Sequence, residues 1–143
     1  MDYLSQFEKI LEGNYRIISL ETYDIERMID MFTRLSRFTN KAIYQWQPEQ
    51  GMHRIGANHI IIPRTQDPKN VLEHIDASTH FGVFILRDFN EALTHKENVG
   101  LLNHIATAGD THRVVVLLSE HVELPEALKP YTLRSRHQLR QAS

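Results

Sequence analysis

The sequence predicts an α/β fold of three layers, α/β/α, in which helices cover both faces of a mostly parallel, five-stranded sheet. Short apolar runs with few interruptions alternate along the chain with amphipathic stretches of helical spacing. Strands that are buried on both faces have such continuous apolar runs, which are typical of parallel sheets. At 143 residues the chain is long enough for one domain with a core of ordinary size.

Two helices and two strands are predicted in the first third of the chain. The first helix ends at Gly13, and residues 16–21 (RIISLE) follow as a short, largely apolar strand. Asp24 precedes a second helix, whose apolar residues lie on one face: Ile25, Met28, Ile29, Phe32 and Leu35. Residues 41–46 (KAIYQW) indicate a second strand, which ends at the PEQG turn.

The rest of the chain continues this alternation. Residues 53–65 leave two interpretations open, because HIIIP fits either a short strand or a packed loop. Asp67 and Pro68 are typical of a helix start, since aspartate caps the first turn and proline suits the first helical position. Beyond them the pattern predicts a strand over 82–88, a helix around 99–106, a strand over 112–119, one helical turn at ELPEAL and a fifth strand over 130–135.

Composition argues against several classes of function. The net charge of −2 and the pI near 6.5 provide no basic field for nucleic acid. The absence of cysteine excludes thiolate metal sites, and the nine histidines follow no metal-ligand spacing. No signal-peptide pattern begins the chain, and no apolar stretch approaches the roughly 20 residues that span a bilayer. We therefore expect a cytoplasmic domain over residues 1–134 and a polar, basic tail over 135–143, without metal or cofactor.

A phosphate loop is missing at the place where a nucleotide-binding fold would have it. Such a loop needs glycines, whose backbone N–H groups close around the anion, and a lysine that reaches the outer phosphates. Between the first strand and the next helix this chain has LETYDIER, with three carboxylates at Glu21, Asp24 and Glu26. We expect Asp24 and Glu26 to satisfy the helix N-terminus, which otherwise attracts phosphate. Ordinary nucleotide binding at this turn is therefore not expected.

Polar residues end the other predicted strands, where sites lie in sheets of this kind. In the stretch FGVFILRDFN, the apolar run ends at Asp88, in the position of the aspartate that holds magnesium in ATP-hydrolysing domains. Without a phosphate loop, we expect Asp88 to be a strand-end carboxylate bonded to nearby backbone N–H groups. Ser119 ends the fourth predicted strand, and Glu120 follows it.

Four segments in order resemble a known family. They are IISLETYDIER, AIYQW, GVFILRDF and VVVLLSEHVELPEALKPY. Together they resemble the N-terminal domain of AAA-type ATPases of the hypothetical chloroplast reading-frame group, over roughly residues 1–134. In that family the domain has the AAA core fold without a working phosphate loop, and it precedes the active ATPase module.

The resemblance implies a sheet of order 5-1-4-3-2 and a non-catalytic role. Ser119 occupies the place of the polar nucleotide sensor of active AAA modules, where asparagine is usual. The chain ends at Ser143 without an ATPase module, so we expect the domain to act on a protein partner, for example an AAA ATPase module in trans, or to form a homo-oligomer.

An alternative is a residual nucleotide- or magnesium-dependent activity centred on Asp88, with Glu21, Asp24 and Ser119 around it. One form of this hypothesis is a phospho-accepting receiver domain, with Lys129 as its basic residue. The spacing speaks against a receiver, because the stretch from Ser119 to Lys129 leaves no room for a full helix between the last two strands.

Two regions are candidate contact surfaces for a partner. The long segment after the second strand carries Trp46, Met52, Ile60 and Ile61, and tryptophan and methionine are favoured in interface cores. The competing interpretation is that these residues pack onto the sheet. The basic end of the chain carries Arg134 and Arg136, which fit phosphate, an acidic partner or a solvated tail.

Overall fold

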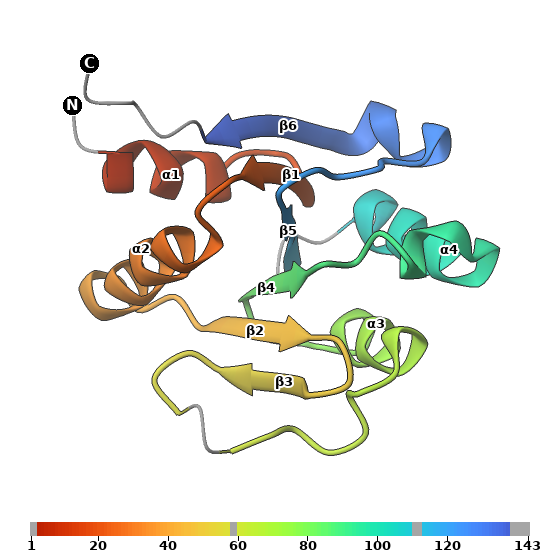
Figure 1. Ribbon diagram of the computed structural model, residues 1–143, viewed down its shortest axis with the longest axis horizontal. Helices are drawn as coiled ribbons and strands as arrows, with labels where there is room; N and C mark the ends of the chain where they lie inside the picture. Colours follow the sequence, from red (N-terminus) through yellow and green to blue (C-terminus); the bar gives the residue numbers. More distant parts are fainter. Residues whose placement is uncertain (1–2, 58–59, 110–112, 138–143) are drawn as a thin grey trace.

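The computed structural model describes residues 3–57, 60–109 and 113–137, which form one six-stranded sheet with helices on both faces (Figure 1). The strands are β1 (Ile17–Thr22), β2 (Ile43–Gln47), β3 (Gly51–Arg54), β4 (Gly82–Arg87), β5 (Arg113–Ser119) and β6 (Thr132–His137). The helices are α1 (Tyr3–Leu11), α2 (Ile25–Phe38), α3 (Pro68–Asp76) and α4 (Lys96–Thr107), with short 3-10 helices η1 (Ala92–Thr94) and η2 (Glu126–Tyr131). The predicted α/β class is confirmed.

The sheet has the order β3-β2-β4-β5-β1-β6, and every pair of neighbours is parallel except β2 and β3. The five strands expected from the sequence therefore take the expected order, but the expected number was wrong. β3 adds an antiparallel strand at the edge. A tight turn sets it beside β2, with Glu49 and Gly51 in the left-handed region at φ 66° and 88°.

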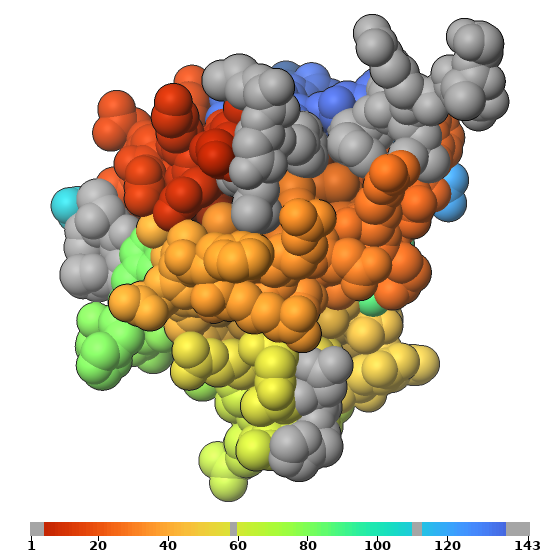
Figure 2. All heavy atoms as spheres, turned by 90° about the vertical axis from the view of Figure 1, so that its left-hand side faces the viewer, coloured from red at the N-terminus to blue at the C-terminus, as the bar shows by residue number. Residues whose placement is uncertain are grey.

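Two pairs of helices enclose the sheet. α1 and α2 cover one face, and α3 and α4 cover the other (Figure 1). Figure 2 looks onto the first face, where α2 lies across the molecule between α1 and the β2–β3 hairpin. Side chains of β4 alternate between the two layers, since Val83 and Ile85 pack with α1 and α2 while Phe84 and Leu86 pack on the opposite side. This double burial explains the uninterrupted apolar runs.

The segment over residues 60–65 packs along β3 as a loop. Ile61 forms an isolated antiparallel bridge with His53, and the N–H of Ile62 donates to the carbonyl oxygen of Met52 at 2.8 Å. The hydroxyl of Thr65 accepts from the N–H of Met52 at 2.9 Å and donates to the carbonyl oxygen of Ile62 at 2.7 Å. The packed-loop interpretation is confirmed, and this loop covers the outer edge of β3.

Trp46 and Met52 lie in the core and cannot form the contact surface expected of them. Their exposed fractions are 2% and 0%. The indole N–H of Trp46 donates to the carbonyl oxygen of Thr65 at 2.6 Å, and its ring packs edge to face against Phe89 with centroids 5.2 Å apart. Trp46 is buried because its polar N–H has a partner and its ring has an apolar neighbour.

Two expected boundaries have different outcomes. The helix start at Asp67 is confirmed, because its carboxylate accepts from the N–H of Lys69 at 2.9 Å. The expected end of the domain at residue 134 is wrong, because β6 pairs with β1 as far as the register Thr22↔His137. The rest of the expected tail, residues 138–143, lies outside the described residues. None of the described helices combines the length and apolar character needed to cross a bilayer.

The Thr65 hydroxyl provides a test of how the 60–65 loop is attached. We predict that Thr65→Val lowers the free energy of unfolding by about 1–3 kcal/mol, because the buried N–H of Met52 loses its acceptor. Thr107→Val is the matched control, since its hydroxyl bonds a helix carbonyl at an exposed position. Urea unfolding followed by circular dichroism measures both variants. An equal decrease in the free energy of unfolding in both variants would contradict the proposed role of Thr65.

Candidate functional site

The carboxyl ends of β1, β5 and β6 enclose a small pocket of about 230 Å³. Its lining comes from the end of β1 and the residue after it, the turn after β5 and the end of β6: Glu21, Thr22, Tyr23, Glu120, His121 and Arg136. Because the strands are parallel, side chains that follow different strands meet at this end of the sheet. Glu21 and Ser119 are register partners in the β1–β5 pair.

Glu21 is the most constrained residue of the pocket. Its Oε2 accepts from the backbone N–H of Val122 at 2.9 Å, and its Oε1 accepts from Nη2 and Nε of Arg136 at 2.7 and 3.0 Å. Nδ1 of His121 lies 3.1 Å from Oε2. The residue is only 7% exposed, so this carboxylate is an anion held inside the protein by a backbone donor and a guanidinium.

These donors lower the pKa of Glu21 from its ordinary value near 4.5. The hydrogen bond from the N–H of Val122 is the largest cause, and the bond from Arg136 follows, while burial opposes both by raising the pKa. Since the folded pKa is lower than the unfolded one, the ionised carboxylate stabilises the fold above the unfolded pKa. This contribution is lost as the pH falls through the folded pKa.

Asp24 and Glu26 have separate roles in the turn before α2. The carboxylate of Asp24 caps the helix by accepting from the N–H of Arg27 at 3.0 Å, as expected. Glu26 lies in the first turn of α2, as expected, and it also forms an ion pair. Its carboxylate pairs with Nη2 of Arg87 at 3.0 Å, because Arg87 leaves the end of β4 on the α2 side, where its Nη1 also donates to Gln45 at 2.7 Å.

The turn after β5 is tied down by two polar side chains. The hydroxyl of Ser119 donates to the carbonyl oxygen of His121 at 2.5 Å. The amide of Asn90, from the loop after β4, donates to the same oxygen at 2.7 Å and accepts from the N–H of Glu123 at 2.9 Å. Ser119 therefore acts on the backbone of this turn, and Asn90 is a contributor that the sequence motifs did not indicate.

Asp88 is not part of this network. It is exposed, its backbone has φ 53°, and its N–H donates to the carbonyl oxygen of Leu118 at 3.0 Å. The expectation that its carboxylate bonds nearby backbone N–H groups is wrong: over the described ranges it has no hydrogen bond or ion pair. The left-handed backbone turns the chain sharply after β4, and aspartate tolerates this conformation better than most residues.

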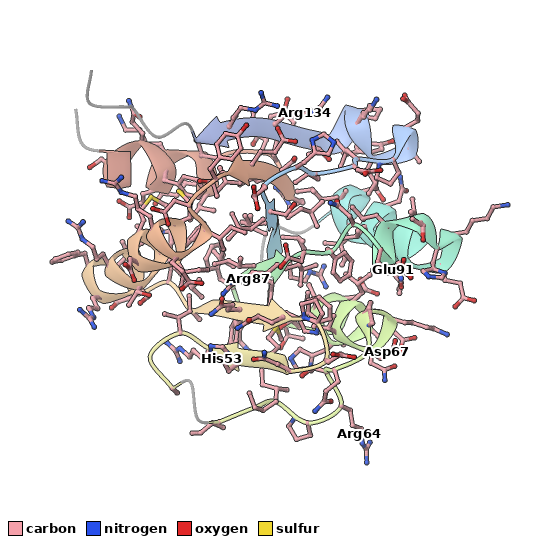
Figure 3. The ribbon with its side chains drawn as sticks, viewed as in Figure 1. His53, Arg64, Asp67, Arg87, Glu91 and Arg134 are labelled. Atoms are coloured by element: carbon pink, nitrogen blue, oxygen red, sulfur yellow. The ribbon has the colours of Figure 1, made fainter. Side chains whose placement is uncertain are left out.

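The remaining candidate residues are dispersed. Ile60 and Ile61 are 58% and 39% exposed beside β3, whereas Arg134 lies exposed on β6 at the opposite edge of the sheet (Figure 3). Arg136 is engaged by Glu21. Among the described residues, no group of three or more histidine, aspartate or glutamate side chains is arranged to hold a metal ion.

The chain matches a known protein family over most of its length. The family model described as "SpoVK-like AAA ATPase, N-terminal domain" matches residues 3–135. The chain belongs to this family. No protein of the curated collection matches it. The expected relation to AAA ATPase N-terminal domains is confirmed, while the narrower relation to the chloroplast reading-frame group stays a prediction.

In this AAA ATPase N-terminal domain, the Glu21 bonds predict a pH-dependent stability. We expect Glu21→Gln to lower the free energy of unfolding by about 1–3 kcal/mol at pH 7, because charge-assisted bonds are lost. The difference from wild type should begin to shrink below about pH 4.5, where the carboxyl group of the unfolded chain takes up a proton. It should be lost as the pH falls through the lower pKa of the folded state. Urea unfolding across a pH series measures both proteins.

Glu120→Gln is the matched control for this prediction. Glu120 lines the same pocket, but it is exposed and its carboxylate has no bond to a described residue. We expect the free energy of unfolding of Glu120→Gln to stay close to that of wild type at each pH. A constant gap between Glu21→Gln and wild type from pH 3 to pH 8 would contradict the assignment.

Proposed function

We propose that the chain is a non-catalytic protein-interaction or regulatory module derived from an AAA ATPase N-terminal domain. The observation that carries this proposal is how the carboxylates at the end of β1 and at the start of α2 are bonded. Glu21 accepts hydrogen bonds from the N–H of Val122 and from Arg136, and Asp24 caps the first turn of α2. Asp24 thus takes the helix N-terminus, where a nucleotide-binding fold would place phosphate oxygens.

Electrostatics oppose a nucleotide at this turn. A phosphate that approached α2 would meet the carboxylates of Asp24 and Glu26, and Glu21 lies in the adjoining pocket. Two like charges about 4 Å apart repel by roughly 4 kcal/mol at an effective dielectric constant near 20. Replacement of Glu21 by phosphate would also require the loss of its bonds to Val122 and Arg136. No glycine or lysine in LETYDIER offsets these costs.

The proposed partner is a protein, and an AAA ATPase module is the first candidate. The family consists of domains that stand N-terminal in AAA ATPases, which supports a role beside such a module. The domain acts on such a module or forms a homo-oligomer, and its expected location is the cytoplasm.

A second candidate function is residual magnesium- or nucleotide-dependent chemistry at Asp88. The favouring observation is that its carboxylate is exposed and has no bond to a described residue, at the end of a buried strand. A receiver-like form of this candidate is disfavoured, because only the 3-10 helix η2 connects β5 to β6.

Thermal unfolding with Mg-ATP, Mg-ADP and magnesium alone separates these two candidates. We predict no change in melting temperature with any of them. A ligand at a hundred times its dissociation constant would stabilise the fold by about 2.7 kcal/mol, a shift that is easily measured. Stabilisation that is lost in Asp88→Asn would establish the second candidate and contradict the first.

A further inference from the structure

The two edges of the sheet differ in how they are protected. At the β3 edge, the 60–65 loop supplies a bridge from Ile61 to His53 and a hydrogen bond from Ile62 to Met52. The polar backbone of that edge is thereby partly satisfied by the chain itself. An exposed edge strand otherwise offers a row of unpaired N–H and C=O groups to any extended chain.

The β6 edge has no such cover in the part of the chain that the structure describes. β6 pairs with β1 alone, in parallel register from Ile17↔Thr132 to Thr22↔His137. Alternate residues of a strand direct their N–H and C=O groups to opposite sides, so about half of those on β6 point away from β1. Figure 1 shows β6 along the outer boundary of the molecule, opposite β3.

The side chains at this edge are of the kinds that dominate protein interfaces. Arg134 is exposed and pairs with no described acid. Exposed tyrosines flank both ends of the β1–β6 pair: Tyr131 directly precedes β6 at 39% exposed, Tyr15 lies two residues before β1 at 42%, and Tyr23 directly follows β1 at 75%. Tyrosine and arginine are enriched in interfaces and in their energetic centres.

The charge of the edge favours an acidic occupant. Residues 127–137 contain Lys129, Arg134 and Arg136 and no carboxylate. Glu21 already compensates Arg136, and Glu126 compensates Lys129 at 2.7 Å, so Arg134 remains as the positive charge on the strand. A second copy of β6 added to this edge would set arginines of the two strands near each other, which is destabilising.

Over the described residues, the outer backbone of β6 has no partner strand and Arg134 pairs with no acid. From these observations and the flanking tyrosines, we infer that β6 binds an extended, acidic segment of a partner protein, which adds to the sheet as a further strand. Main-chain hydrogen bonds provide affinity in this mode, and alternate side chains provide specificity. An acidic side chain of the segment pairs with Arg134, and its neighbours contact Tyr131 or Tyr23. The inference rests on the proposed function and names the surface that performs it.

The test uses defined peptides and the whole chain. The probe is an acetylated peptide of about ten residues that alternates glutamate with valine or threonine, a length that matches an edge strand. One control peptide has lysine in place of glutamate. Another keeps the glutamates but is N-methylated at alternate residues, so that it cannot donate backbone hydrogen bonds. Titration of the ¹⁵N-labelled chain follows amide shifts, and hydrogen exchange follows the protection of the β6 amides.

We expect the acidic peptide to shift and protect amides of β6, and both control peptides to bind at least about tenfold more weakly. Arg134→Glu should weaken the binding of the acidic peptide about tenfold or more. Arg34→Glu, the matched control, changes the charge equally at an exposed position on α2 and should leave binding unchanged. Arg134 is exposed, so both variants are expected to fold like wild type.

Three results would overturn the inference: no binding of the acidic peptide at millimolar concentration, equal binding of the N-methylated peptide, or concentration-dependent shifts of β6 without peptide, which would make a second copy the occupant. None of these three results changes the outcome expected from thermal unfolding with Mg-ATP or Mg-ADP. Stabilisation by Mg-ATP or Mg-ADP would instead contradict the proposed function while the edge could still bind peptide, so the two failures are distinguishable.

Discussion

The carboxylate of Glu21 accepts hydrogen bonds from the N–H of Val122 and from Arg136, and through them it joins the turn after β5 and the strand β6 to the end of β1. A buried carboxylate is costly unless donors compensate it, and here a backbone amide and a guanidinium do so together. The same bonds hold the turn after β5 in place, where Ser119 and Asn90 add their own. The carboxyl ends of three strands are therefore fixed by polar contacts within the protein.

This internal anion is the main reason for our proposal that the domain binds no nucleotide. The fold brings a strand end and a helix N-terminus together, an arrangement that commonly binds phosphate. In this chain Asp24 caps that helix N-terminus, and Glu21 accepts from Val122 and Arg136. Over the described residues, the outer edge of β6 pairs with no further strand and Arg134 is exposed. The proposed binding surface is therefore the outer edge of β6, and its proposed ligand is an extended segment of another polypeptide.

Local patterns were sufficient to predict most elements, because buried parallel strands and amphipathic helices have distinct periods. The pattern did not predict β3, since only four residues form it and a tight turn supplies its register. It also did not predict the partners of Glu21, which lie 101 and 115 residues away along the chain. Burial of Trp46 depended on a distant carbonyl, that of Thr65, so sequence alone left its position open.

The most direct test of the internal anion is the effect of inorganic phosphate on Glu21→Ala. Removal of the carboxylate leaves the N–H of Val122 and the guanidinium of Arg136 without their acceptor. We predict that phosphate raises the melting temperature of the variant, while wild type responds no more than it does to chloride at equal ionic strength. An identical response of the two proteins would contradict the claim that Glu21 holds the place of a bound anion.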